Sequence, residues 1–391
     1  MQRLAVLSSH PIQYHAVLFR ELARRLDAHV FFAHRATPDE QARAGFGAAF
    51  EWDVDLTTGY NRSFLNNISP RPGTDRFSGC DTPEIGARLR EGRFDAALIF
   101  GWHLKSFMQG LIAAKRLGMP VLVRGDSQLA TPRSKLKMEA KAIAYPFFLR
   151  MFDVALYVGA RSRQYYEHYA YPAERLFFSP HCVDIGWFAA RATEGARRDL
   201  RNMLGVSDEA RVLLFAGKLQ PFKRPLDIIS AARILRARGQ NVEAMVAGDG
   251  ELHSAMIEAA AKDDVPLHML GFCNQSRMPA VFAASDCLTL PSTGRETWGL
   301  VANEALACGR PIVVSDACGC SLDLAADGGA GRSFRTGDVM MLADMIDDIF
   351  ETAPDAAAMT RVSEQYSPQA AVDGVIAALD YLKRRRSRAV S

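Results

Sequence analysis

The sequence predicts an α/β protein with two Rossmann-like domains, each built on a doubly wound parallel sheet. Short, β-branched apolar runs alternate with amphipathic helical stretches along most of the chain, which is typical of parallel sheets covered on both faces. The length of 391 residues exceeds what one ordinary core supports, so two domains are expected. A charged, Ala-rich connection interrupts the alternation near residues 185–205, and we expect the domain boundary there.

The apolar runs give the expected order of elements. Strands are expected at residues 3–9, 28–34, 96–101, 120–125, 154–159, 176–180, 211–217, 243–250, 287–292 and 311–316. Residues 14–26 and 225–239 carry apolar side chains at helical spacing. The predicted domains are residues 1–185, on the acceptor side, and residues 206–366. Residues 367–391 should form a C-terminal helix and basic tail, with Ser367 as N-cap and Pro368 in the first turn.

Composition excludes several classes of protein. Hydrophobic residues make up 49% of the chain and charged residues 23%, as in folded globular proteins. A net charge of +3 does not indicate a nucleic-acid-binding protein. The seven cysteines are odd in number and scattered, so we expect reduced thiols. The first apolar run is too short for a secretory signal, and no run is long enough to span a bilayer. We therefore expect a cytoplasmic protein.

Residues 291–316 contain the most informative pattern. A strand leads into a polar, Gly-containing loop, and a helix is expected from about Gly299 to Cys308. Free N–H groups at the start of such a helix form an anion site at the carboxyl edge of a sheet. Glu296 precedes the helix and Glu304 lies about one turn inside it. A carboxylate there is poor for phosphate but suits the hydroxyl groups of a ribose or a sugar.

Three further loops follow strands of the second domain. Lys218 and Lys223 lie five residues apart on one strand-to-helix loop, where both ammonium groups can reach a single diphosphate. The turn at 248–250 is either a simple turn or a ligand contact, and it lacks the glycines of a dinucleotide fingerprint. The turn at 271–274 offers backbone groups beside which a base could lie.

These residues, in this order, resemble the retaining family-4 glycosyltransferases of the GT-B fold, in which two Rossmann-like domains face each other across a cleft. The pair Glu296-x7-Glu304 is the signature of that family. The resemblance covers most of the second domain and implies that Glu304 holds the donor ribose and that Glu296 lies near the donor sugar. It also implies that Lys218 and Lys223 contact the diphosphate and, with Glu296, act in catalysis. The other donor-binding residues expected are Gly248, Gly271, Phe272, Thr297, Trp298, Gly299 and Leu300.

The first domain resembles a subgroup of this family more loosely, in residues 8–25, 52–56 and 124–127. Arg124 and Asp126 follow a predicted strand and are the candidates for a catalytic group there. His10 and His103 are the acceptor-side candidates. The chain also departs from the family pattern, because Lys218 stands where Arg is usual and because the first loop is not Gly-rich.

Charged residues outside these loops bear on metal binding and on membrane contact. Asp53 and Asp55 have the spacing of a metal-binding pair on one face of an apparent strand, but no third ligand is evident. We therefore expect no metal and no cofactor, the nucleotide sugar being a co-substrate. The basic residues Arg133, Lys135, Lys137 and Lys141 fit either a solvated face or contact with an anionic membrane that carries a lipid-linked acceptor. The same alternatives apply to the basic tail at 383–386.

The resemblance thus predicts a retaining, metal-independent glycosyltransferase of the hexosyltransferase type. It would move a sugar from a nucleotide-sugar donor to a carbohydrate or lipid-linked acceptor, in cell-surface polysaccharide or glycolipid synthesis. One alternative is a nucleotide-sugar epimerase of the same fold, which needs no acceptor. Another is a donor-binding scaffold without catalysis, although both glutamates and both lysines are present. A dehydrogenase is disfavoured by the missing glycine fingerprint.

Overall fold

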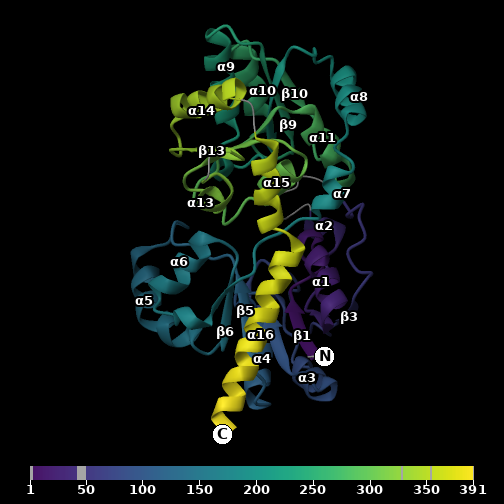
Figure 1. The fold of residues 1–391 in the computed structure, drawn as a ribbon, viewed down its shortest axis with the longest axis vertical. Helices are drawn as coiled ribbons and strands as arrows, with labels where there is room; N and C mark the ends of the chain where they lie inside the picture. Colours follow the sequence, from purple (N-terminus) through teal and green to yellow (C-terminus); the bar gives the residue numbers. More distant parts are fainter. Residues whose placement is uncertain (1–2, 42–49, 327–328, 353–354, 391) are drawn as a thin grey trace.

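The computed structural model describes residues 3–41, 50–326, 329–352 and 355–390. Two parallel sheets form the centres of two lobes, one above the other in Figure 1, with helices around each. The α/β class and the GT-B arrangement expected from the sequence are confirmed. Within the described ranges, no helix is long and apolar enough to cross a membrane.

The first sheet has seven parallel strands in the described residues, in the order β3-β2-β1-β4-β5-β6-β7. The strands are β1 (Arg3–Ser8), β2 (Asp27–Phe32), β3 (Asn61–Phe64), β4 (Ala96–Ile99), β5 (Val121–Gly125), β6 (Val154–Tyr157) and β7 (Leu176–Phe178). The helices are α1 (Gln13–Arg25), α2 (Pro38–Gln41), α3 (Ile85–Gly92), α4 (Lys105–Arg116), α5 (Lys135–Leu149) and α6 (Ala160–His168). Short 3₁₀ turns lie at Phe77–Gly79 and Ala173–Arg175.

The second sheet repeats this plan with six strands among the described residues, in the order β10-β9-β8-β11-β12-β13. The strands are β8 (Arg211–Ala216), β9 (Val242–Ala247), β10 (Leu267–Met269), β11 (Cys287–Leu290), β12 (Ile312–Ser315) and β13 (Gly331–Phe334). The helices are α7 (Ile185–Ala189), α8 (Glu194–Leu204), α9 (Leu226–Ala237), α10 (His253–Lys262), α11 (Met278–Ala284), α12 (Val301–Ala307), α13 (Ser321–Leu324), α14 (Val339–Thr352) and α15 (Ala356–Gln365). Pro221–Lys223 and Gln275–Arg277 form 3₁₀ turns.

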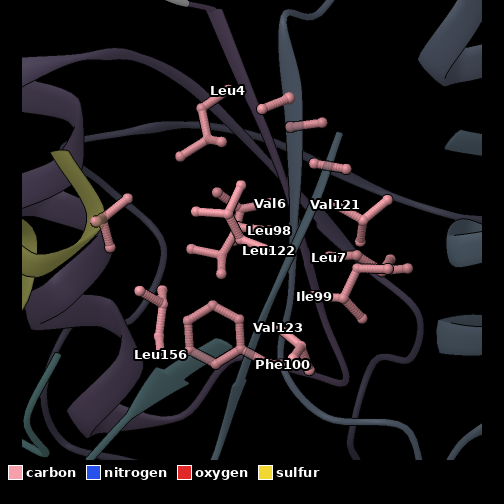
Figure 2. Close-up of a cluster of buried hydrophobic side chains, with 14 of the residues drawn as sticks. Leu4, Val6, Leu7, Leu98, Ile99, Phe100, Val121, Leu122, Val123 and Leu156 are labelled. Atoms are coloured by element: carbon pink, nitrogen blue, oxygen red, sulfur yellow. The ribbon is translucent and has the colours of Figure 1, made fainter. Parts of the chain in front are cut away.

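Buried side chains cover both faces of the first sheet, as expected for a doubly wound fold. Figure 2 shows them on alternate sides of β1, β4 and β5, because successive residues of a strand point to opposite faces. Leu4, Val6, Leu98 and Leu122 lie on one side, and Leu7, Ile99, Val121 and Val123 on the other.

Three strands were not predicted, and each is at an edge of its sheet. β3, β10 and β13 contain only three or four residues and are partly exposed, so they lack the apolar run by which a central strand is found. The strand expected around Asp53 and Asp55 is wrong, since Asp53 lies in a bend and Asp55 in irregular backbone. Asp55 accepts hydrogen bonds from the backbone N–H groups of Thr57 and Thr58, which fixes a turn.

The charged connection near residues 185–205 forms helices α7 and α8. Two of its charged residues hold the connection to the rest of the second domain, because α8 packs on α11 and presents two arginines to Asp286. The guanidinium of Arg201 is 2.7 Å from the Asp286 carboxylate and also donates to the backbone oxygens of Ala284 and Ala210. Arg197 binds the other oxygen of Asp286 at 2.8 Å.

The last helix, α16 (Pro368–Val390), leaves the second domain and packs on the first. It is the long yellow helix that runs down the lower lobe in Figure 1. Ala371, Val372 and Val375 are buried in the first core. Ser367 caps the helix, since its hydroxyl accepts a hydrogen bond from the Ala370 N–H at 3.2 Å. The chain therefore crosses between the domains twice, before α7 and before α16.

We expect Asp286→Ala to lower the free energy of unfolding by about 3–5 kcal/mol, because it leaves the buried Arg201 without its counter-ion. The exposed pair of Arg238 with Asp344 is the matched control, and Asp344→Ala should cost about 0–1 kcal/mol. Urea unfolding followed by circular dichroism measures both. Equal costs for the two substitutions would contradict a structural role for the buried cluster.

Candidate active site between the two domains

A cavity of about 980 Å³ lies between the two sheets. Loops that follow β1, β2, β5 and β7 line it from the first domain, and loops that follow β8, β9, β10 and β11 line it from the second. Both sheets thus present their carboxyl edges to the same space, and in each the strand order reverses direction beside the first strand. This is where doubly wound folds bind ligands.

Lys223 and Glu296 form an ion pair in the wall of this cavity. Lys223 ends the 3₁₀ turn after β8 and donates a hydrogen bond to the Glu296 carboxylate, and the two side chains are only 15% and 16% exposed. The Ser292 hydroxyl lies 3.4 Å from the same carboxylate oxygen. The two loops are also joined by the Thr293 N–H, which donates to the Phe222 carbonyl at 2.8 Å. The predicted lysine and glutamate are therefore brought together.

Lys218 lies on the same wall, directly after β8. Burial lowers the pKa of its ammonium group, and the charge of Lys223 lowers that pKa further. The backbone here is packed too closely for a side chain, because a Cβ on Gly248 would lie 1.9 Å from the Gly217 oxygen. Gly248 also has φ of +155°, a conformation that favours glycine. Two partly desolvated cations thus face one space, where an anion is favoured.

Glu304 lies inside α12 and is 4% exposed. Burial raises the pKa of its carboxyl group to about 8, and a hydrogen bond from the Tyr14 side chain acts in the opposite direction. Tyr14 comes from α1 of the first domain, and burial keeps its hydroxyl protonated by raising its pKa well above 10. A buried carboxyl group is therefore held at the cavity by a donor from the other domain. Sequence reasoning missed Tyr14, which lies within residues 8–25 but belongs to no motif of its own.

The loop before α12 contributes Thr297, Trp298, Gly299 and Leu300 to the cavity. The helix itself begins at Val301, two residues later than expected. Trp298 is 3% exposed, and its indole N–H donates to the Asn303 side chain at 2.8 Å. The indole ring is also packed against His181, at 5.6 Å between ring centroids. Trp298 therefore fixes the loop as well as lining the site.

Phe272 lines the cavity after β10, and its ring lies 4.3 Å from that of Phe50 in the first domain. Gly271 does not line the cavity. Its φ is +65°, and its carbonyl accepts a hydrogen bond from the Gly248 N–H at 2.8 Å. An aromatic surface and a tight backbone turn thus stand where a base was expected to lie.

From the first domain, Asp126 and His10 line the cavity. The Thr297 hydroxyl donates to the Asp126 carboxylate at 2.7 Å, across the domain boundary. Burial lowers the pKa of His10 to about 4, so its imidazole is neutral at pH 7. Asp126 and His10 therefore offer oxygen and nitrogen acceptors opposite the two lysines.

Besides Gly271, two predicted residues of the first domain are not brought into the cavity. Arg124 is 4% exposed and donates to the backbone oxygens of Ser179 and Pro180, so it supports the loop before His181. His103 is exposed and packs edge-on against Phe107. The structure adds His34, paired with Glu40 at 2.9 Å, and the loop at 71–76, which carries two arginines. The loop at 71–76 lies in an irregular region, and neither it nor His34 belongs to a sequence motif.

Possible metal ligands are not clustered. Within residues 3–41, 50–326, 329–352 and 355–390, no group of three or more His, Cys, Asp or Glu side chains could hold a metal ion. Asp53 instead accepts hydrogen bonds from Ser276, at 3.1 Å from the backbone N–H. This carboxylate therefore joins a first-domain loop to the second domain.

Comparison with known sequences gives the second domain a family. Residues 196–366 match the family described as "Glycosyl transferases group 1". A "D-inositol 3-phosphate glycosyltransferase" of Arthrobacter sp. (strain FB24) is 30% identical over 260 residues, which are 61% of this chain and 58% of that one. The protein of the same name from Stackebrandtia nassauensis is 33% identical over 194 residues, 46% of this chain and 42% of that one. The chain spans about half the length of the curated relatives it matches.

Solved structures share the fold over nearly the whole chain. Anabaena Alr3699/HepE in complex with UDP has a TM-score of 0.73 at 18% identity, covering 97% of this chain and 100% of that one. Sucrose-phosphate synthase from Thermosynechococcus elongatus has a TM-score of 0.68 at 16% identity, covering 100% of both. Residues 196–366 thus match the glycosyl transferases group 1, and the chain as a whole has the two-domain GT-B fold.

Proposed function

We propose that the protein transfers a sugar from a nucleotide-sugar donor to an acceptor hydroxyl, with retention at the anomeric carbon and without a metal. One observation carries the proposal: a single cavity wall brings together Lys218, Lys223, Glu296 and Glu304. Retention is supported by the spacing of the two glutamates, which is that of the retaining family-4 enzymes. Synthesis of a cell-surface polysaccharide or glycolipid, from the cytoplasm, remains part of the proposal.

The charges of this wall support a position for the donor in the proposed complex. The diphosphate lies against Lys218 and Lys223, and the ribose hydroxyls donate to Glu304. The base lies beside Phe272, and the transferred sugar lies near Glu296. When the anomeric C–O bond breaks, the departing diphosphate gains negative charge, which the two lysines of the same wall would stabilise. The solved neighbour with bound UDP makes a UDP-sugar the first donor to test.

The acceptor enters from the first domain. Asp126 and His10 face the second domain across the cavity, and both are acceptors that can orient a hydroxyl group at neutral pH. Arg71 and Arg76 line the same side. They would suit an anionic acceptor, such as the phosphorylated one implied by the name of the relatives.

Transfer is tested by incubating the protein with UDP-, GDP- and ADP-sugars, with and without carbohydrate and lipid-linked acceptors, in excess EDTA. One donor class should raise the melting temperature, and nucleoside diphosphate should appear only when an acceptor is present. Conversion of the donor sugar without an acceptor would identify an epimerase. Donor binding without turnover, for every acceptor class, would identify a scaffold. Activity lost in EDTA and restored by magnesium would overturn metal independence.

We expect Lys223→Ala to reduce single-turnover rates about 100- to 1000-fold at saturating donor, because its charge is needed most as the diphosphate leaves. Lys218→Arg should be tolerated, since the family usually has Arg there and its planar group can bind two phosphate oxygens. The exposed Lys262, at the end of α10, gives the control variant Lys262→Ala. A Lys223→Ala rate within threefold of the parent would remove this lysine from the diphosphate site.

Donor affinity should depend on pH through Glu304. Below its pKa of about 8, the Glu304 carboxyl group of the empty site is protonated. In the proposed complex it is a carboxylate, which accepts hydrogen bonds from both ribose hydroxyls. Donor binding should then release a proton, so the affinity for an intact UDP-sugar should rise from pH 6 to pH 8, by up to about tenfold per unit. At higher pH the lowered pKa of Lys218 should reverse the trend as its ammonium loses charge.

Calorimetric titration of the parent and of Glu304→Gln from pH 6 to pH 9 measures this dependence. The substitution should weaken binding by about 1.5–3 kcal/mol at pH 8 and abolish the rise between pH 6 and pH 8. The alkaline decrease should remain in both proteins. A slope on the acid side that is identical in parent and variant would show that Glu304 does not hold the donor.

A further inference from the structure

Helix α5 in the first domain exposes a continuous apolar stripe. Leu136, Ile143 and Phe147 are 77%, 74% and 74% exposed, and Ala140 between them is exposed too. Their spacings of four, three and four residues place all of them on one face of the helix. Side chains of this size are normally buried, so an aligned set of them in water is a surface that favours a partner.

The opposite face of α5 already has its partner within the domain. Leu149 is fully buried, and the ring of Phe148 lies 5.9 Å from that of Phe152. Lys141 also turns inward, where its ammonium donates to the Tyr165 hydroxyl at 2.6 Å and lies over the ring of Tyr145. The apolar stripe is therefore not the face by which α5 packs on its own domain. It is a second apolar face, on the opposite side of the helix.

The charges beside the stripe are mostly positive. Lys135, Lys137 and Arg150 are exposed, and Arg133 is half-buried just before the helix. Glu139 is the one acidic residue between 133 and 150. A helix with an apolar face, basic flanks and its axis along the protein surface has the character of an interfacial helix. The basic groups would lie at the level of anionic headgroups, to which they are attracted.

The stripe is joined to the cavity by a short segment. Asp126 lines the cavity, and α5 begins at Lys135. Between them, the Gln128 side-chain amide donates to the carbonyl oxygens of Gly294 and Glu296, at 3.0 Å each. A Cβ on Gly294 would lie 2.5 Å from the Ala130 oxygen, so the segment is packed directly on the Glu296 loop. A surface bound by α5 would thus lie beside the acceptor side of the cavity.

We propose that α5 docks the protein on an anionic lipid bilayer, with Leu136, Ala140, Ile143 and Phe147 inserted among the headgroups. The basic flanks decide for this partner over a second copy of the chain, because in a symmetric dimer through α5 like charges would face each other. Docking of this kind would present the cavity to an acceptor held on a lipid. That consequence rests on the proposed transferase activity, whereas docking itself does not.

Sedimentation with vesicles tests the proposal without any turnover. Vesicles of phosphatidylcholine with about one third phosphatidylglycerol should carry the parent protein into the pellet, and pure phosphatidylcholine should do so at least tenfold less. The double variant Ile143→Asp/Phe147→Asp should bind these vesicles at least tenfold more weakly than the parent protein. Lys135→Glu/Lys137→Glu should remove the preference for anionic lipid. The control Met203→Asp/Met340→Asp changes exposed apolar residues of the second domain and should bind as the parent does.

Melting curves establish that each variant is folded, and the milder Leu136→Gln/Ile143→Gln replaces the first variant if the double aspartate is not. Parent protein that stays in solution with both kinds of vesicle would overturn the proposal. So would binding that survives the changes in the stripe. A dimer in sedimentation velocity that disappears in Ile143→Asp/Phe147→Asp would assign the face to a second copy instead. Loss of transfer to every acceptor, with vesicle binding intact, would refute the proposed activity and not the docking.

Discussion

The cavity depends on how the first domain holds the loop that carries Glu296. Gln128 donates to the backbone of this loop twice, and the Thr297 hydroxyl donates to Asp126. Within the second domain, the Gly319 N–H donates a hydrogen bond to the Glu296 carbonyl at 3.0 Å. A short strand-to-helix loop would otherwise be a flexible element. These bonds from both sides fix the Glu296 carboxylate where Lys223 can bind it.

Desolvation then gives the site its chemistry. The pKa values of Glu304, His10 and Lys218 are all shifted chiefly by burial, and each shift favours the neutral form. An arrangement that destabilises its own charges when empty gains most from a ligand of complementary charge. A diphosphate beside two lysines, with hydroxyl groups beside a carboxyl group, is such a ligand. The same burial that costs stability in the free protein therefore becomes binding energy for the donor.

The second domain was predictable because its site lies mainly on the strand-to-helix connections after β8 and β11, which are neighbours in the sheet. Lys223, Glu296 and Glu304 each stand a few residues from a central apolar strand, so local pattern and family spacing located them. The whole-chain fold was predictable for the same reason, since alternating strands and helices fix a parallel sheet.

The first domain was less predictable because its contributions come from elsewhere in the chain. Tyr14 and Glu304 are 290 positions apart in the sequence, and no local pattern records such a contact. Arg124 shows the reverse case. It lies near the end of a strand, as a site residue should, but its guanidinium donates hydrogen bonds to the carbonyls of Ser179 and Pro180. Sequence position gives the edge of the sheet, whereas the side chain's direction depends on the neighbouring strands.

The two chain crossings limit how the domains can move. α16 starts beside the second domain and is inserted in the first core, where a Cβ on Gly374 would lie 1.7 Å from the Phe178 oxygen. The helix therefore cannot slide along β7 without losing this contact. Rotation of one domain on the other must then be absorbed at the short segments before α7 and before α16. Rotation at these segments would widen the cavity while leaving each sheet, and the lysines and carboxylates on it, unchanged.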